Sequence, residues 1–274
     1  NAWRYRDYVI KAFQQDKPYN QFMTEQIAGD EIDPDNLEAQ IATGYLRHWI
    51  YEYNQRDAKS QWSIILNDIT DVTGDTFLGM GMSCARCHDH KFDPILQADY
   101  FRLQAFFSPL LPINSVPLAA PEQVAEYQAK LEKWELATTE IRKQIETMQS
   151  PKLKSSRDAQ YAKFPLDVRP FLFMDASERT PYQQQLAYLA DLQVNDQIAK
   201  IKWDTHFKDS QKEKWDKLQS QLKEFEELKP SPLEVIPTVT DVSATPPRTL
   251  IQDSDQAVNP GVLSILNPED TPIS

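Results

Sequence analysis

Apolar residues recur along the first 110 residues at the spacing of amphipathic helices. On the first predicted helix they lie three or four positions apart, at Trp3, Tyr5, Tyr8, Val9, Ala12 and Phe13. The pattern breaks at Asp16-Lys17-Pro18 and resumes over residues 19–28, before a glycine. The same spacing predicts further helices over residues 35–47, 58–77 and 97–107.

The pattern changes after residues 108–122, which we interpret as a proline-rich connector. Apolar positions then alternate by three and four along one long helix, at Val124, Tyr127, Leu131, Trp134, Thr138 (the one polar member), Ile141, Ile145 and Met148. A second helix over residues 211–228 has a similar seam, at Trp215, Leu218, Leu222 and Phe225. Such seams predict an antiparallel helical hairpin, with residues 150–210 inserted between its arms. The alternative is that both seams are buried in the main body.

Helical periodicity ends near Pro230. The β-branched residues and prolines that follow favour a few short or edge strands. The predicted fold is therefore mainly α, in three parts. Residues 1–110 form a compact helical region, residues 111–229 the hairpin with its insertion, and residues 230–274 a short β-containing tail.

Composition narrows the possible functions. The net charge of −12 excludes a generic nucleic-acid binder, which needs a basic surface. It favours solubility, the alternative being an acidic face that docks a basic partner. No run approaches the roughly 20 apolar residues of a transmembrane helix. The chain starts in a helical pattern without Met, so we expect a piece of a longer polypeptide whose targeting segment has been removed.

Residues 82–94, MSCARCHDHKFDP, hold both cysteines of the chain and two of its four histidines. Cys84, Cys87 and His88 form the pattern C-x-x-C-H. Two thiols at this spacing can form thioethers with the vinyl groups of one haem, and the adjacent imidazole can coordinate the iron. The pattern therefore predicts one covalently attached haem c, with His88 as the proximal ligand.

Three other uses of these residues remain open. A thioredoxin-like dithiol requires a βαβ setting, whereas a long helical pattern precedes this motif. Zinc could take both cysteines together with His88 and His90, although such closely spaced ligands would be crowded. A disulfide between Cys84 and Cys87 would close a very small loop and stabilise little.

Haem also needs apolar surroundings and a hydrogen-bond acceptor for the Nδ1–H of His88. We expect that acceptor to be a backbone carbonyl near Asp93 or Pro94. Apolar candidates flank the motif, at Phe77, Leu78, Met80, Met82, Phe92, Ile95 and Leu96.

The distal iron position is a separate question. His90 cannot reach it, because two residues of chain cannot carry the imidazole to the opposite face of the haem. We expect His90 to form a local hydrogen bond, or to face a propionate, a substrate or solvent. His48 is the leading distal candidate, and a packed or surface histidine is the alternative. The other candidates are His206, Met23, Met148 and Met174, or an empty position.

Several stretches of the sequence resemble the planctomycete-type cytochrome c-like family. They are RYRDYVIKAFQQDKPYNQFMTEQIAGD, ATGYLR, DVTGDTFLGMGMSCARCHDHKFDPILQADYFRLQAFF and TPPRTLIQDSDQAVNPGVLSIL. The extended motif C-x-x-C-H-x-H-K-[FY]-D-P makes the resemblance specific. It covers about residues 1–110 and implies a cytochrome c-like haem-binding domain whose beginning lies before this sequence. Residues 232–269 resemble the opening of the associated domain of unknown function.

The resemblance implies an exported protein of the periplasm, extracellular space or cell envelope, with covalent haem at Cys84, Cys87 and His88. It also marks His90, Lys91 and Asp93 as motif positions without an assigned role. It supplies no substrate, because the reaction of the family is not established.

The leading hypothesis is a monohaem c-type cytochrome module that transfers single electrons within a larger oxidoreductase or envelope complex. Its partner would be a redox protein or another haem domain, and the hairpin could mediate homo- or hetero-oligomers. One alternative is an envelope scaffold or assembly protein in which the haem is structural. Another is a haem enzyme with an open distal site, so the sequence does not decide whether the protein is an enzyme.

Overall fold

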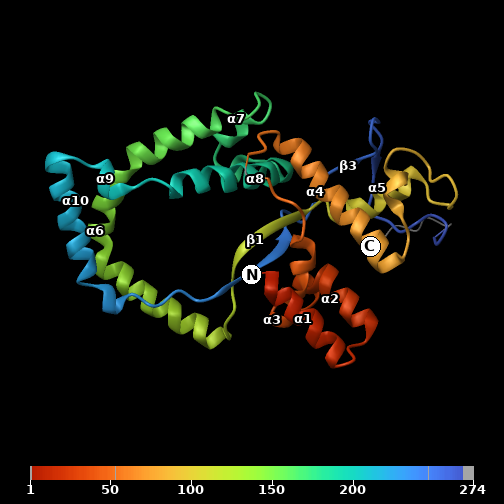
Figure 1. The fold of residues 1–274 in the computed structure, drawn as a ribbon, viewed down its shortest axis with the longest axis horizontal. Helices are drawn as coiled ribbons and strands as arrows, with labels where there is room; N and C mark the ends of the chain where they lie inside the picture. The colour runs from red at the N-terminus through yellow and green to blue at the C-terminus, as the bar shows by residue number, and fades with distance from the viewer. Residues whose placement is uncertain (1, 53, 246, 268–274) are drawn as a thin grey trace. The chain divides into compact units, whose positions relative to one another are not determined.

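The computed structural model describes residues 2–52, 54–245 and 247–267. It is 61% helix and 7% strand, which confirms the predicted mainly α fold (Figure 1). Among the described residues, no helix combines the length and the apolar character needed to cross a membrane. The last residues of the predicted tail, 268–274, lie outside this description.

The chain divides into two compact units. The first comprises Asn1–Asn114, Met174–Leu189 and Pro237–Ser274, and the second comprises Ser115–Phe173 and Ala190–Ile236. Each unit therefore draws on separate stretches of the chain, whereas the three parts predicted from the sequence are contiguous.

Short helices make up most of the first unit. In chain order they are α1 (Ala2–Gln14), α2 (Tyr19–Ile32), α3 (Leu37–Ala42), η1 (Thr43–Arg47), α4 (Ala58–Thr73), η2 (Gly74–Leu78), η3 (Met82–Arg86), α5 (Gln97–Ala105), η4 (Ala176–Glu178) and the first part of α8 (Pro181–Ala199). The helices predicted between residues 1 and 107 are confirmed. The helix predicted over residues 35–47 ends in the tighter 3-10 turn η1, and that over residues 58–77 ends in the wider π turn η2.

Side-chain caps and prolines explain where these helices begin. The Asn36 side chain accepts hydrogen bonds from the first amides of α3, and Asp57 accepts one from Ser60 at the start of α4. Pro18 precedes α2 and separates it from α1, as its fixed φ and missing amide donor predict.

Two small sheets complete the strand content. Strand β1 (Leu110–Pro117) pairs with β2 (Val235–Asp241), and β3 (Thr249–Leu250) pairs with β4 (Ala257–Val258) in antiparallel register. The proline-rich connector predicted over residues 108–122 is thus partly a strand. Prolines are compatible with it because both strands of a two-stranded sheet are edge strands.

The helices around η1 bury polar side chains that pair with late parts of the chain. The hydroxyl oxygens of Thr43 and Thr238 lie 2.5 Å apart, and Thr238 also donates to the Gln40 side chain. All three residues are buried. This network joins α3 and η1 to strand β2, about 195 residues later in the sequence.

A half-buried carboxyl in the first unit, that of Asp30, should make stability depend on pH. Burial raises the pKa of Asp30 to about 6, and the nearby carboxylates of Glu31 and Asp241 add to the effect. Because the folded state binds this proton more tightly, the stabilisation is full below the ordinary pKa of 3.8. It is lost as the pH rises through about 6.

We therefore expect Asp30→Asn to raise the free energy of unfolding at pH 7 and to flatten its dependence between pH 4 and 6. Urea unfolding at four pH values across this range measures both effects. Asp35→Asn, at an exposed position of the following loop, is the control and should keep the wild-type slope. An Asp30→Asn protein with the wild-type slope would contradict the assignment.

The second unit is built on one long helix. Its elements are α6 (Pro121–Tyr161), α7 (Arg169–Leu172), the last part of α8, α9 (Trp203–His206), α10 (Asp209–Lys223) and η5 (Glu226–Leu228). Helices α6 and α10 pack side by side in opposite directions, which confirms the predicted hairpin (Figure 1). The first arm is longer than predicted, because α6 continues through Pro151 as far as Tyr161.

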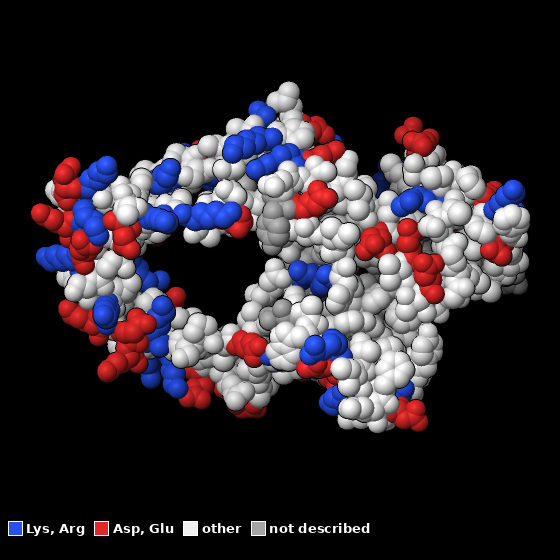
Figure 2. Space-filling model, in the orientation of Figure 1, with Lys and Arg blue, Asp and Glu red and all other residues white. Residues whose placement is uncertain are grey.

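The seam positions carry the packing of the hairpin. On α6, Trp134 and Thr138 are buried and the six other seam residues are half-buried, while most intervening positions are exposed. On α10, Trp215 and Leu218 are buried. Lys, Arg, Asp and Glu side chains are interspersed over the outer surface of the hairpin (Figure 2). This mixture of charges is typical of solvated helix faces stabilised by pairs such as Glu126 and Lys130.

Candidate functional site

The cysteine motif follows a sharp turn at the end of α4. This helix runs into the wide turn η2, which ends at Gly79 with φ +64°, a left-handed conformation that favours glycine. A second glycine, Gly74, lies against Met82, so a Cβ atom there would come within 3.0 Å of the sulfur. The chain thus turns back tightly, and the turn brings Met82 at the start of the motif against the end of α4.

The motif itself forms a short 3-10 helix, η3, with two different faces. Met82 and Ala85 are fully buried, whereas Cys84 and Cys87 are exposed. Residues three apart are eclipsed in a 3-10 helix, so each pair lies on one face. The fold therefore places both thiols together on the outer face, and neither forms a disulfide.

The inner face of η3 packs on a core that the motif alone does not predict. Its other buried members come from the turn before α5, from α5 itself and from the C-terminal part of the chain: Ile95, Tyr100, Phe101, Ile251 and Leu263. Asp99 links α5 to the C-terminal part of the chain, because its buried carboxylate accepts hydrogen bonds from the amide and the hydroxyl of Ser264. Sequence reasoning missed Asp99, whose separation of 165 residues from Ser264 leaves no local pattern.

His88 is exposed, and one of its ring nitrogens is held by the backbone. Its Nδ1 lies 2.7 Å from the carbonyl oxygen of Asp89. The predicted type of acceptor is present, but it belongs to Asp89 rather than to Asp93 or Pro94. Since a carbonyl only accepts, Nδ1 carries the proton in neutral His88, and Nε2 keeps the lone pair that a metal ion needs.

Asp89 also connects this turn to the next helix. Its carboxylate accepts the Gln97 amide at 2.8 Å, at the first residue of α5. The Gln97 side chain donates to the carbonyl of Arg86 at 3.1 Å. The segment that carries Cys87 and His88 is thus fastened at both ends to α5.

His90 forms local hydrogen bonds, which is one of the alternatives predicted for it. Its Nδ1 accepts the backbone amide of Asp93 at 2.9 Å, and its own amide donates to the Ile95 carbonyl at 2.8 Å. The Asp93 carboxylate lies 3.2 Å from the same nitrogen. Because the amide of Asp93 points at Nδ1, we assign Nδ1 as an acceptor. His90 therefore closes the turn that leads from the motif into α5.

The two other motif positions lie near the surface of this turn. Lys91 places its ammonium 5.2 Å from the centre of the Phe92 ring, a cation–π distance. The side chain of Asp93 is 64% exposed. Lys91 and Asp93 remain motif positions without an assigned role.

The predicted apolar surroundings divide between core and surface. Met82 and Ile95 are buried beneath the motif, and Phe77 packs on Tyr45 with ring centres 5.2 Å apart. Phe92 is 84% exposed, and Leu78 and Leu96 are 42% and 44% exposed. These three side chains flank the cysteines in sequence and expose apolar surface.

A charged pair lies behind the outer face of η3. The guanidinium of Arg86, between the two cysteines in sequence, is 3.7 Å from the Asp71 carboxylate on α4. Burial raises the pKa of Asp71, against the opposing effects of Tyr100 and Arg86. Arg86 therefore links the motif to α4 electrostatically.

The two histidines predicted as candidates for the distal iron position, His48 and His206, both contact aromatic rings. His48 follows η1, where its ring packs on Tyr5 with centres 4.7 Å apart, and it lines a small cavity with Tyr45 and Trp49. His206 belongs to the second unit and packs on Trp203 and Phe207. Both histidines are exposed despite these ring contacts, and ligation by either stays a prediction.

A zinc ion and a covalently attached haem place different requirements on the residues of this motif. Within the described parts of the chain, no three His, Cys, Asp or Glu side chains gather into a set that could hold a metal ion. Zinc requires such a set. A c-type haem requires two accessible thiols and one imidazole nitrogen for the iron, together with apolar surroundings.

Comparison with known proteins gives a match to one family. No curated protein and no solved structure matches the chain. Residues 1–111 match the family model PSCyt2, which is described as a protein of unknown function (DUF1549). This match is consistent with a planctomycete cytochrome-associated domain of unknown function. Over the stretch that contains the whole cysteine motif, the chain is therefore similar to the PSCyt2 family.

Proposed function

We propose that the chain is a c-type cytochrome module, with one haem attached covalently through Cys84 and Cys87. The observation that carries the proposal is the geometry of η3. Cys84 lies within this short helix and Cys87 caps its end, and both cysteines are exposed. A buried or disulfide-bonded pair would not be available for thioether formation.

His88 supports the proposal as the proximal ligand. The hydrogen bond from its Nδ1 to the Asp89 carbonyl orients the ring and leaves Nε2 as the coordinating nitrogen. Gln97 and His90 fasten the flanking backbone. These residues restrict the motion of the ligand, which favours a constant iron environment in both oxidation states.

The exposed apolar side chains complete the site. Leu78, Phe92 and Leu96 would cover parts of the haem edge and lower the local polarity. The haem supplies reversible one-electron chemistry when it is bound. We therefore propose single-electron transfer with a redox protein or another haem domain, in an exported protein of the cell envelope.

Expression with export and the cytochrome c maturation system tests haem attachment. We expect the intact mass to exceed that of the polypeptide by one haem, and an alkaline pyridine spectrum typical of two thioether bonds. Cys84→Ser combined with Cys87→Ser should abolish the mass increase. Ser83→Ala, at the exposed residue before Cys84, should leave it unchanged. A mass equal to the bare polypeptide under these conditions would refute the proposal.

The iron coordination then separates electron transfer from the alternatives. Reversible reduction and fast exchange with another cytochrome support an electron-transfer module. Carbon monoxide binding to the reduced protein without ligand displacement would indicate an enzyme with an open distal site. A redox-silent haem together with oligomers that depend on the α6–α10 hairpin would indicate a scaffold.

A further inference from the structure

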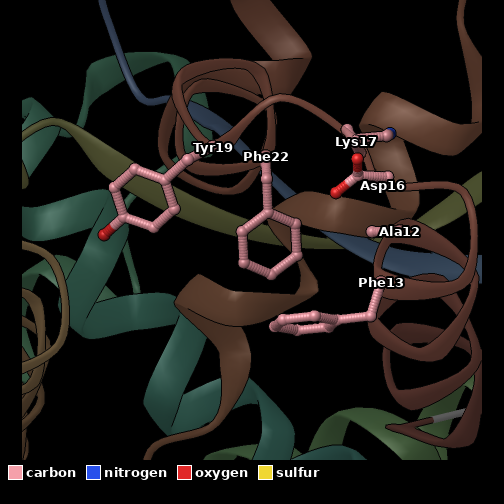
Figure 3. Close-up of a pocket in the computed structure, with 6 residues that line it drawn as sticks. All are labelled: Ala12, Phe13, Asp16, Lys17, Tyr19 and Phe22. Carbon is pink, nitrogen blue, oxygen red and sulfur yellow. The ribbon is translucent and has the colours of Figure 1, made fainter.

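A second candidate site lies at the turn between α1 and α2. An open cavity of about 260 Å³ is formed there (Figure 3). None of its lining residues belongs to the cysteine motif. They are Ala12, Phe13, Asp16, Lys17, Tyr19 and Phe22.

Three aromatic rings form the walls of this cavity. The rings of Phe13 and Phe22 meet edge to face, with centres 5.7 Å apart and planes at 63°, and Tyr19 lies beside Phe22 (Figure 3). Tyr8 stacks on Phe22 at 5.9 Å and holds it in place. Phe13 is nevertheless 76% exposed and Tyr19 60% exposed, so aromatic surface is left open to a ligand.

The charge in the cavity that is not neutralised by an ion pair is negative. Lys17 is 8% exposed and lies 2.5 Å from the Glu25 carboxylate, so its charge is neutralised within the helix pair. Asp16 is exposed, and its carboxylate has no hydrogen bond or ion pair with any residue in the described ranges. Its φ of 51° belongs to the left-handed region that the turn between the helices requires.

We propose that this cavity binds a trimethylammonium group. Aromatic faces attract cations, and three rings with one free carboxylate attract them more strongly than either feature alone. A methylated ammonium has no N–H donors, so walls of phenylalanine and alanine leave none of its groups unpaired. The cavity volume accommodates a group of this size. The group could be part of a free amine such as choline or of a choline headgroup in a lipid bilayer.

Calorimetric titration of the full chain with choline tests the site. We expect saturable binding, with 3,3-dimethylbutan-1-ol, the uncharged isostere, binding at least about tenfold more weakly. Asp16→Asn and Phe13→Ala should each weaken choline binding about tenfold. Asparagine tolerates the left-handed backbone at residue 16, so the first variant removes the charge without strain.

One control variant should bind choline as the wild type does. Ile10→Ala removes a half-exposed apolar side chain from α1, outside the cavity.

Sedimentation with vesicles distinguishes the two sources of the ligand. Binding to phosphatidylcholine but not to phosphatidylglycerol vesicles, lost in Phe13→Ala and without binding of free choline, would assign the lipid headgroup. Binding of free choline would assign a small amine. Absence of binding in both experiments, or binding that Asp16→Asn and Phe13→Ala leave unchanged, would overturn the proposal.

Discussion

Replacement of Arg47 by alanine is expected to destabilise the first unit by about 2–4 kcal/mol. Arg47 ends η1, and its guanidinium joins three separate parts of the chain. It donates to the carbonyl oxygens of Ile113 at 2.8 Å and Thr238 at 2.7 Å, and to the Asn114 side chain at 2.9 Å. Burial lowers the pKa of this guanidinium, which reflects how far it is removed from water.

The loss of stability arises from the hydrogen-bond acceptors left without a donor as much as from the removal of the arginine itself. Without the guanidinium, two backbone carbonyls at the β1 and β2 strands lose their charged donor, and buried acceptors without partners are costly. Arg47→Lys should also be clearly destabilising, because one ammonium cannot reproduce the planar fork that reaches all three groups.

Chemical denaturation followed by circular dichroism measures these changes. Arg6→Ala provides the control, because Arg6 also pairs with a neighbour, Asp7, but on an exposed part of α1. It should change the free energy of unfolding by less than about 1 kcal/mol. An Arg47→Ala protein within that same limit would show that the guanidinium does not hold the strands together.

Gly29→Ala is the second substitution with a large expected effect, about 3 kcal/mol of destabilisation. A Cβ atom at residue 29 would lie 2.5 Å from the carbonyl oxygen of Ala39 and 3.0 Å from its carbonyl carbon. Both are backbone atoms of α3, a helix whose start is capped by Asn36. The clash therefore cannot be relieved by the rotation of a side chain. The packing of α2 on α3 would have to open.

Gly81→Ala is the matched comparison for this prediction. A Cβ atom there meets nothing within 4 Å, and its φ of −72° suits any residue. We expect a change between neutral and a stabilisation of about 1 kcal/mol. Thermal unfolding of both variants measures the contrast, and equal melting temperatures would contradict the close contact between α2 and α3.

Local features of this fold could be predicted from the sequence. Helical spacing located α1, α2, α4 and α5, and the alternation of three and four located the seam of α6 around Trp134. The motif gave the candidate residues Cys84, Cys87 and His88 directly, since their chemistry depends on spacing alone. Each of these signals is contained within a few turns of chain.

The support of the site could not be predicted in the same way. Ile251 and Leu263 pack behind the motif, and Ser264 binds Asp99, through contacts between residues far apart in sequence. Such contacts leave no periodic pattern in either partner. The role of His90 was difficult for another reason, because its hydrogen bond to the Asp93 amide depends on the conformation of one turn.

Thr238 forms hydrogen bonds with Gln40, Thr43 and Arg47. These bonds have a consequence for folding during synthesis. Synthesis runs from the N-terminus, so η1 emerges long before strand β2, the source of its buried partners. Until then these polar groups lack the partner that Thr238 provides. The stretch that matches the PSCyt2 family is therefore not equivalent to a unit of folding, because its interior is completed by the last third of the protein.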